Sequence, residues 1–254
     1  MQQKRKKRAS LSKVLLRLSA LLLFLVASFV FFVLSGIGVF GLAVECPRAN
    51  RAQDEVMAML ETKQRKTDAL LNERKLCPSS IDTDNYRHAS QMHVTGIGDS
   101  LMVAAVEELY TQFPNGYFDA IVGRSVDEGL QVLMRMEEDG LLGDVIVLSF
   151  SNACDLSKET CEEIMSHVQG KPVFWVKPNA IASTCPILDE ISQSYPNAYV
   201  VDWQSVATSH MRDYILSDSV HPNHAGSEAY ALLIDIVITQ DLLGYKSSIA
   251  GIGG

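Results

Sequence analysis

The chain has 254 residues, with 22 Lys and Arg against 30 Asp and Glu, and its formal net charge is −8. The charge is uneven: the first 44 residues hold seven basic residues and no acidic one, so the other 210 carry a net charge of −15. Nucleic-acid affinity depends largely on Lys and Arg that displace counterions, so this acidic body argues against a nucleic-acid-binding protein. Hydrophobic residues make up 47% of the chain, which excludes a wholly disordered chain and a disulfide-held mini-protein.

Residues 18–44 form an uncharged, mostly apolar run of 27 residues. About 20 apolar residues cross a bilayer core, whereas the apolar part of a cleavable signal peptide has roughly 7 to 15. The run therefore predicts a retained transmembrane anchor. The basic cluster at residues 4–8 favours a cytoplasmic tail at residues 1–17. We expect a single-pass cell-membrane protein whose remaining chain lies outside the cytoplasm, in the periplasm or on the cell surface.

Residues 45–91 are predicted to form a helical stem and a linker. The helix is expected from Asn50 to Lys75 and the polar linker from Pro78 to Gln91. Apolar residues recur in the helix at roughly helical spacing, which indicates a packing face rather than a functional motif. A globular domain is expected at residues 92–245, followed by a flexible tail at residues 246–254.

The chain contains five cysteines, so at least one is free or pairs with another molecule. Cys46 and Cys77 bracket the stem helix, and a straight helix would hold them too far apart to pair. Cys154 and Cys161 are the closest pair in sequence, and we expect a disulfide between them. No Cys-x-x-Cys motif occurs, and neither a metal nor another cofactor is expected.

Within residues 92–245, short apolar runs alternate with amphipathic stretches, which is typical of an α/β domain with a parallel sheet. This pattern predicts a five-stranded doubly wound sheet, whose reactive residues would lie at the carboxyl ends of its strands. The expected strands are His93 to Ile97, Asp119 to Val122, Val145 to Phe150, Val173 to Val176 and Ala198 to Val201. The expected helices are Leu101 to Gln112, Val126 to Glu138, Lys158 to Val168, Pro186 to Tyr195 and Ala225 to Thr239.

Gly98-Asp99-Ser100 stands between the first expected strand and the following helix. A serine at such a turn has an exposed hydroxyl and a backbone N–H at a helix amino terminus, where developing negative charge is stabilised. Ser100 is therefore a candidate acyl-transfer nucleophile. The same residues would equally suit a helix N-cap at Asp99 or Ser100.

Asp218 and His221 lie three residues apart just before the last helix. The histidine ring can donate its Nδ1–H to the carboxylate, which leaves Nε2 free to deprotonate a serine. This spacing favours the catalytic interpretation of Ser100. His224 is the alternative base, but no acidic residue precedes it by three, so we expect it at the surface. His221 and His224 also lack an obvious third metal ligand.

Taken together, Gly98-Asp99-Ser100 and Asp218-x-x-His221-Pro222 resemble the motifs of the SGNH (GDSL-type) hydrolase superfamily. The resemblance covers about residues 92–240 and implies a three-layer, flavodoxin-like fold. Within that superfamily, the chain is most similar to the extracytoplasmic SGNH domains of membrane O-acyltransferases, including peptidoglycan O-acetyltransferases. The segments that carry this narrower likeness are Ile97 to Ser100, Phe118 to Arg124, the strand ending at Asn152, and Val200 to Trp203.

The resemblance implies an oxyanion hole formed by the backbone N–H groups of Ser100 and Gly123 and the side-chain amide of Asn152. Without the flanking motifs, Gly123 would be interpreted as a turn glycine and Asn152 as a loop cap. Asp99, Arg124 and Phe150 are expected to contact the substrate.

One position departs from the family. The related domains usually read Gly-Thr-Asn-Gly where this chain has Phe150-Ser151-Asn152-Ala153. The large ring is therefore expected to reshape the loop or to narrow the acceptor pocket.

The leading hypothesis is a membrane-anchored serine esterase or O-acyltransferase that acts on O-acyl esters, expected to be acetyl, of a cell-envelope glycan. Ser100 would be the nucleophile, His221 the base and Asp218 its orienting group. A transferase would need a separate membrane protein as acyl donor. The alternative hypothesis is a weakly active or inactive SGNH module that binds glycan or organises an envelope complex, which Phe150 favours and the intact Ser100, Asp218 and His221 oppose.

Overall fold

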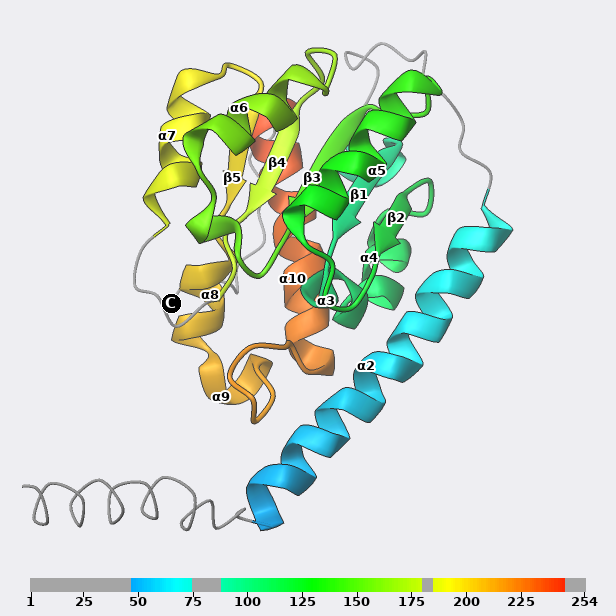
Figure 1. Cartoon of the computed structure of the whole chain (residues 1–254), viewed down its shortest axis with the longest axis vertical. Coiled ribbons are helices and arrows are strands. Elements are labelled where there is room, and N and C mark those ends of the chain that lie inside the picture. Colours follow the sequence, from blue (N-terminus) through cyan, green and yellow to red (C-terminus); the bar gives the residue numbers. More distant parts are fainter. Residues whose placement is uncertain (1–46, 75–87, 180–184, 245–254) are drawn as a thin grey trace, which may run out of the picture. The chain divides into compact units, whose positions relative to one another are not determined.

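The computed structural model describes residues 47–74, 88–179 and 185–244. Five parallel strands form the central sheet in the order β2-β1-β3-β4-β5 (Figure 1). The strands are β1 (Val94–Gly98), β2 (Tyr117–Ala120), β3 (Val145–Ser149), β4 (Val173–Val176) and β5 (Ala198–Val201). Since Gly98 is in register with both Ala120 and Ser149, the ends of the first three strands lie at one edge.

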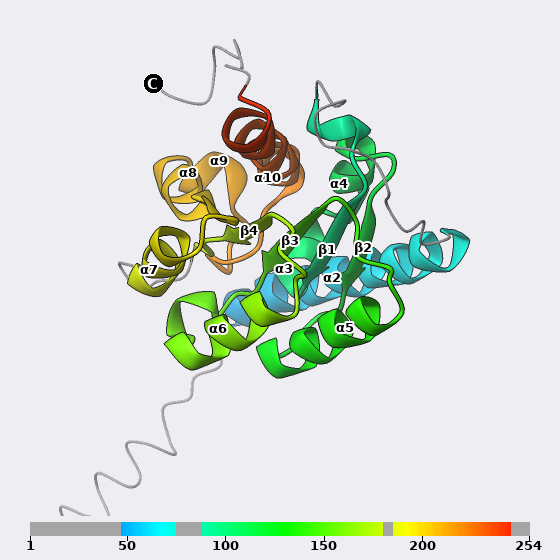
Figure 2. The ribbon, with the colours of Figure 1, turned by 90° about the horizontal axis from the view of Figure 1, so that it is seen from above.

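Helices cover both faces of this sheet. Figure 2 shows α4 and α10 on one face and α5 and α6 on the other. The first layer comprises α3 (Ser100–Ala104), α4 (Val106–Gln112) and α10 (His224–Val237), and the second comprises α5 (Val126–Glu138), α6 (Lys158–Ser166) and α7 (Pro186–Ser194). The remaining elements are α2 (Pro47–Glu73), α8 (Trp203–Ser209), α9 (Met211–Tyr214), two short 3₁₀ turns, η2 (Ala89–Gln91) and η3 (Ala153–Asp155), and a π turn, η4 (Ile238–Leu242).

The alternation of side chains along each strand divides the interior into two cores. In β3, Val145 and Val147 face the α3-α4-α10 layer, whereas Ile146 and Leu148 face the α5-α6-α7 layer. Successive side chains on a strand point to opposite faces, and a parallel sheet covered by helices on both faces needs apolar residues on both. The near-continuous apolar runs in the sequence follow from this arrangement.

Helix α2 runs along the outer edge of β2, where backbone groups have no neighbouring strand. Arg74, just after the helix, donates to the carbonyl oxygen of Gly116 at 3.2 Å. Ten residues earlier, the Gln64 amide donates to the carbonyl oxygen of Ala120 at 3.0 Å. Val56 and Leu60 of α2 are also buried. The stem helix of residues 51–73 therefore packs against the α/β body.

The predicted five-stranded, doubly wound parallel sheet is confirmed, and the bounds of β4 and β5 agree with the prediction. The helix expected over Leu101 to Gln112 is interrupted at Ala105, and α8 and α9 were not anticipated. No helix in the described segments is long and apolar enough to cross a bilayer. The predicted tail at 1–17, anchor at 18–44 and terminal segment at 246–254 lie outside those segments, as do Cys46 and Cys77.

Candidate active site

Ser100 is the first residue of α3 and follows the end of β1. Its hydroxyl oxygen lies 2.8 Å from Nε2 of His221, although the two residues are 121 positions apart in sequence. The preceding residue, Asp99, caps the helix by accepting a hydrogen bond from Leu101 N at 3.0 Å. The residue that caps the helix is thus Asp99, and the hydroxyl of Ser100 remains available to the histidine.

The His221 ring is held by the loop on which it lies. Its Nδ1 is 2.6 Å from Oδ2 of Asp218, and the other carboxylate oxygen accepts from the backbone N–H of Val220 and of His221 at 2.9 and 3.0 Å. Leu216 N donates to the His221 carbonyl oxygen at 2.8 Å and closes the loop. Because Nδ1 donates to the carboxylate, Nε2 is the acceptor that faces the serine hydroxyl.

The pKa of Asp218 lies below its ordinary value of 3.8. Partial burial has the largest single influence and raises the pKa, but hydrogen bonds from the His221 ring and from the backbone of Val220 and His221, together with the charge of His221, outweigh it. The carboxylate is therefore ionised at neutral pH. An ionised Asp218 holds the ring in one tautomer and stabilises it when it gains a proton.

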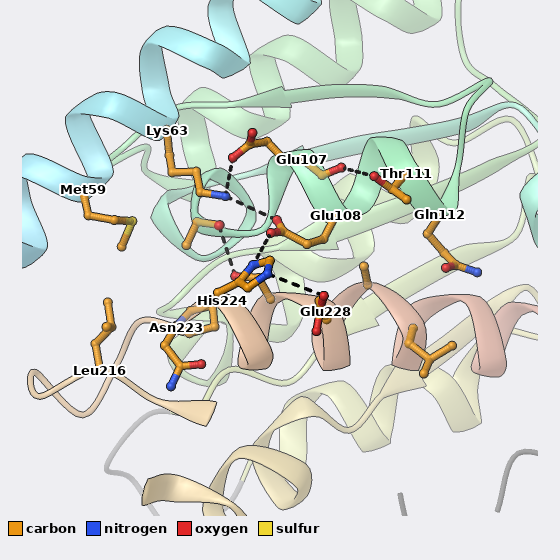
Figure 3. Close-up of a pocket in the computed structure, with 15 residues that line it drawn as sticks. Met59, Lys63, Glu107, Glu108, Thr111, Gln112, Leu216, Asn223, His224 and Glu228 are labelled. Carbon is orange, nitrogen blue, oxygen red and sulfur yellow. Dashed lines mark hydrogen bonds and ion pairs between the residues drawn. The ribbon is translucent and has the colours of Figure 1, made fainter. Parts of the chain in front are cut away.

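The second histidine of this segment, His224, has a different environment. It begins α10 with 79% of its side chain exposed, and its Nδ1 lies 3.1 Å from a carboxylate oxygen of Glu108 (Figure 3). The ring thus pairs with α4. The structure agrees with the expected surface position of His224.

The two expected oxyanion donors follow the strands on either side of β1. Gly123 lies three residues beyond the end of β2, and Asn152 lies three residues beyond the end of β3. Gly123 has a φ of 77° in a turn closed by Arg124 N and the Ile121 carbonyl oxygen at 3.1 Å, a conformation that favours glycine. Both residues are exposed, and within the described segments the Asn152 side chain makes no hydrogen bond.

Asp99 and Arg124, which are expected to contact the substrate, are both buried. Asp99 is 2% exposed, and its two carboxylate oxygens accept from Leu101 N and Ser151 N, the latter at 2.6 Å. Arg124 is 7% exposed, and its guanidinium donates to the carbonyl oxygens of Gly98 and Asp119 and to the Asp119 carboxylate. Both side chains are occupied in fixing the backbone of the strand ends.

Phe150, which is expected to contact the substrate and to reshape the loop or narrow the acceptor pocket, is buried as well. Phe150 continues the alternation of Ile146 and Leu148, so its side chain enters the core between the sheet and the α5-α6-α7 layer. Its ring lies against Gly129 of α5, where any Cβ would collide with it. The replacement of glycine at this position therefore adds a core side chain beneath α5.

The cysteines pair differently from the expectation. Cys154 forms a disulfide with Cys185, with a Cα–Cα distance of 4.6 Å, whereas Cys161 is a buried free thiol. Helix α6 directs Cys161 into the core, which separates it from Cys154 in spite of their proximity in sequence. Burial raises the pKa of the Cys161 thiol to about 11. The disulfide joins η3, which follows Asn152, to the start of α7.

Two further residues contact the candidate site without having been predicted. Asn179, which follows β4 and is 4% exposed, donates from Nδ2 to the Ser219 carbonyl oxygen at 3.3 Å. Its position just after the end of β4 is the sequence signal that could have marked Asn179 as a candidate site residue. Gln64 of α2 contacts the segment before Gly123, and no local sequence signal marks it. No group of three potential metal-ligating side chains occurs in the part of the chain that the structure describes.

The fold and these contacts define a doubly wound α/β domain with a serine, a histidine and an aspartate in one hydrogen-bonded series. No protein-family model matches the chain. The peptidoglycan O-acetyltransferase OatA of Listeria monocytogenes is 23% identical over 147 residues, a match that covers 57% of this chain and 24% of the relative. The O-acetyltransferase OatA of Staphylococcus aureus is 24% identical over 143 residues, covering 54% and 24%.

Among solved structures, the carboxyl-terminal catalytic domain of peptidoglycan O-acetyltransferase A (OatA) from Streptococcus pneumoniae matches with a TM-score of 0.52 and 22% identity. That match covers 59% of this chain and 94% of the solved domain. The resemblance inferred from the sequence is thus confirmed, since the chain is homologous to part of the OatA proteins and shares the fold of the pneumococcal domain. The chain spans about a quarter of the length of the curated relatives that it matches.

Proposed function

We propose that this chain is a serine esterase or O-acetyltransferase that acts on O-acetyl esters of peptidoglycan or a similar cell-envelope glycan. The observation that carries the proposal is the series from the Ser100 hydroxyl through the His221 ring to the Asp218 carboxylate, with distances of 2.8 and 2.6 Å. This series supports Ser100 as the nucleophile, His221 as the base and Asp218 as the orienting carboxylate, because acyl transfer needs such a hydrogen-bonded series. The homology with the OatA proteins supports the choice of an acetyl ester.

In the first half of the reaction, the Ser100 oxygen attacks the ester carbonyl while Nε2 of His221 accepts the hydroxyl proton. The backbone N–H of Ser100 and Gly123 and the amide of Asn152 stabilise the resulting oxyanion. Such donors are each worth roughly 3 kcal/mol in the transition state. When the intermediate collapses, the bond to the leaving oxygen breaks, His221 returns the proton to that oxygen, and the acetyl group stays on Ser100.

In the second half, water or a glycan hydroxyl attacks the acyl-enzyme and His221 again acts as the base. Water releases acetate and regenerates Ser100, whereas a glycan hydroxyl yields an acetylated sugar. Transfer requires an acetyl donor, and we propose that a separate membrane protein supplies it. Hydrolysis requires no such partner.

We further propose that residues 18–44 anchor the protein in the cell membrane and that the domain lies outside the cytoplasm. The length of the uncharged run and the basic cluster before it support this topology. The Cys154–Cys185 disulfide adds support, because such bonds persist mainly in oxidising compartments. Protease added to spheroplasts should digest the domain, and its protection would contradict this orientation.

The activity is tested with the full chain in detergent and a chromogenic acetyl ester. We expect turnover by the wild type, and we expect a sulfonyl fluoride to label Ser100, because the pneumococcal relative was solved with a methylsulfonyl adduct. Ser100→Ala and His221→Ala should each lose nearly all activity, because the members of such a series act as a unit. His224→Ala, which changes an exposed histidine, is the control and should remain active.

The outcome also separates the proposal from a module that only binds glycan. The buried position of Phe150 removes the observation that favoured such a module. If the wild type neither hydrolyses acetyl esters nor reacts at Ser100, the proposed enzyme function is wrong. Full turnover by Ser100→Ala would instead refute the serine mechanism.

A further inference from the structure

Gln64 of helix α2 contacts the backbone beside the proposed oxyanion donor Gly123. Its Nε2 donates to the carbonyl oxygen of Ala120 at 3.0 Å, and its Oε1 accepts from the N–H of Val122 at 2.8 Å. The same Nε2 lies 2.9 Å from Oδ1 of Asp68, one helical turn further on. Both polar ends of one carboxamide thus hold the two residues that flank Ile121, where the turn of residues 121–124 begins.

This contact completes the support of the turn that carries Gly123. On the inner side, Ile121 N donates to the Gly98 carbonyl oxygen at 3.2 Å, which fixes the segment to β1. On the outer side, Gln64 fixes Val122. Because the peptide between Val122 and Gly123 carries the proposed donor N–H, its orientation depends on how firmly Val122 is held.

Helix α2 is itself held close to the nucleophile. Nζ of Lys63 lies 2.7 Å from a carboxylate oxygen of Glu107 and 3.4 Å from one of Glu108, both on α4 (Figure 3). Leu60, which is 1% exposed, packs in a buried cluster with Ala104 at the end of the helix that begins at Ser100. Gln64 is therefore presented by a helix with its own contacts to the body.

We propose that Gln64 is a positioning residue that orients the Gly123 turn for oxyanion stabilisation, so that the stem helix supports the proposed oxyanion hole through this one side chain. The inference rests on the proposed function, since it concerns the same acyl-transfer site. Gln64 does not touch the reacting atoms. Its loss should therefore lower transition-state stabilisation without changing how the ester binds.

The test compares full-length variants on the chromogenic acetyl ester, with kcat expressed per site that a sulfonyl fluoride labels to completion. We expect Gln64→Ala to lower kcat roughly tenfold with KM unchanged, because a displaced donor costs less than the roughly 100-fold or greater loss on removing one. Gln64→Met, which keeps the length but not the hydrogen bonds, should lose as much. Gln64→Glu keeps the acceptor for Val122 N but sets a carboxylate oxygen against the Ala120 carbonyl oxygen and the Asp68 carboxylate, so it should not recover kcat.

Arg65→Ala is the matched control, because Arg65 is exposed on the same helix and its hydrogen bond is to Thr62 within α2. It should match the wild type. An unchanged kcat per labelled site in Gln64→Ala would overturn the inference and leave the proposed function intact, even if less of that variant folds. A wild type without turnover and without labelling would defeat the proposed function, and the inference would fail with it.

Discussion

Asp99 provides the most direct test of how the candidate site is held together. Its carboxylate accepts from Leu101 N in the helix after Ser100 and from Ser151 N in the loop that carries Asn152. It is 2% exposed, so water does not replace a lost partner. The Asp99→Asn variant keeps the shape of the side chain but leaves one acceptor oxygen for two N–H donors.

The expected cost follows from these two contacts. A hydrogen bond to a charged group contributes about 1.5 to 3 kcal/mol, and an unsatisfied buried donor costs about 1 to 3 kcal/mol. We expect the free energy of unfolding to fall by about 3 kcal/mol. For a domain of this size, each kcal/mol lowers Tm by roughly 2 to 4 °C, which gives a fall of roughly 6 to 12 °C.

The assay is thermal unfolding of the full chain followed by tryptophan fluorescence, since Trp175 and Trp203 are fully buried. The kcat for an acetyl ester, measured below the transition, should also fall roughly tenfold because Ser151 precedes Asn152 and small displacements of catalytic groups are costly. Asp54→Asn, on the exposed face of α2, is the control. If Asp99→Asn unfolds at the wild-type temperature with unchanged kcat, Asp99 does not join the two loops as inferred.

Four further outcomes are expected. The double variant Cys154→Ser, Cys185→Ser should have a free energy of unfolding in urea that is lower by roughly 3 to 4 kcal/mol, because the disulfide closes a loop of 31 residues. Cys161, with its raised pKa, should resist iodoacetamide at pH 8 until the chain is unfolded. Phe150→Gly should destabilise by at least about 3 kcal/mol through the cavity it leaves, and an unchanged Tm would contradict the core position. Since the pKa of Asp218 is lowered by folding, its stabilisation is present above pH 3.8 and lost as pH falls through the folded pKa, so Asp218→Asn should flatten the acid side of the stability curve.

The features predicted correctly from the sequence depend on local patterns. The strands are short apolar runs bounded by turn residues, because a sheet that helices cover on both faces needs apolar side chains on both. Asp218 and His221 lie on one loop, so their contact is readable from their spacing. The position of Ser100 at the start of a helix is readable because a strand, a turn and a helix succeed one another within a few residues.

The features that were missed depend on contacts between distant segments. Gln64 touches residues 56 and 58 positions away, and Cys154 pairs across 31 residues. The core position of Phe150 was missed for a different reason: the residue lies just beyond β3, and its side chain points into the core because the strand alternation continues through it. The identity of residue 150 alone does not predict on which face of the sheet its ring packs.

The hydrogen bonds along β2 have a consequence for the exposed edge of the sheet. Gly116, Phe118, Ala120 and Val122 direct backbone groups away from β1, and side chains satisfy one group of each: Arg74 binds Gly116, Tyr110 binds Phe118 and Gln64 binds the other two. An uncovered edge of this kind is a template on which another chain can add a strand. Gln64 of α2 and Arg74 just after it cover part of this edge, so we expect a fragment beginning after Arg74 to expose β2 and to self-associate more readily than the full chain.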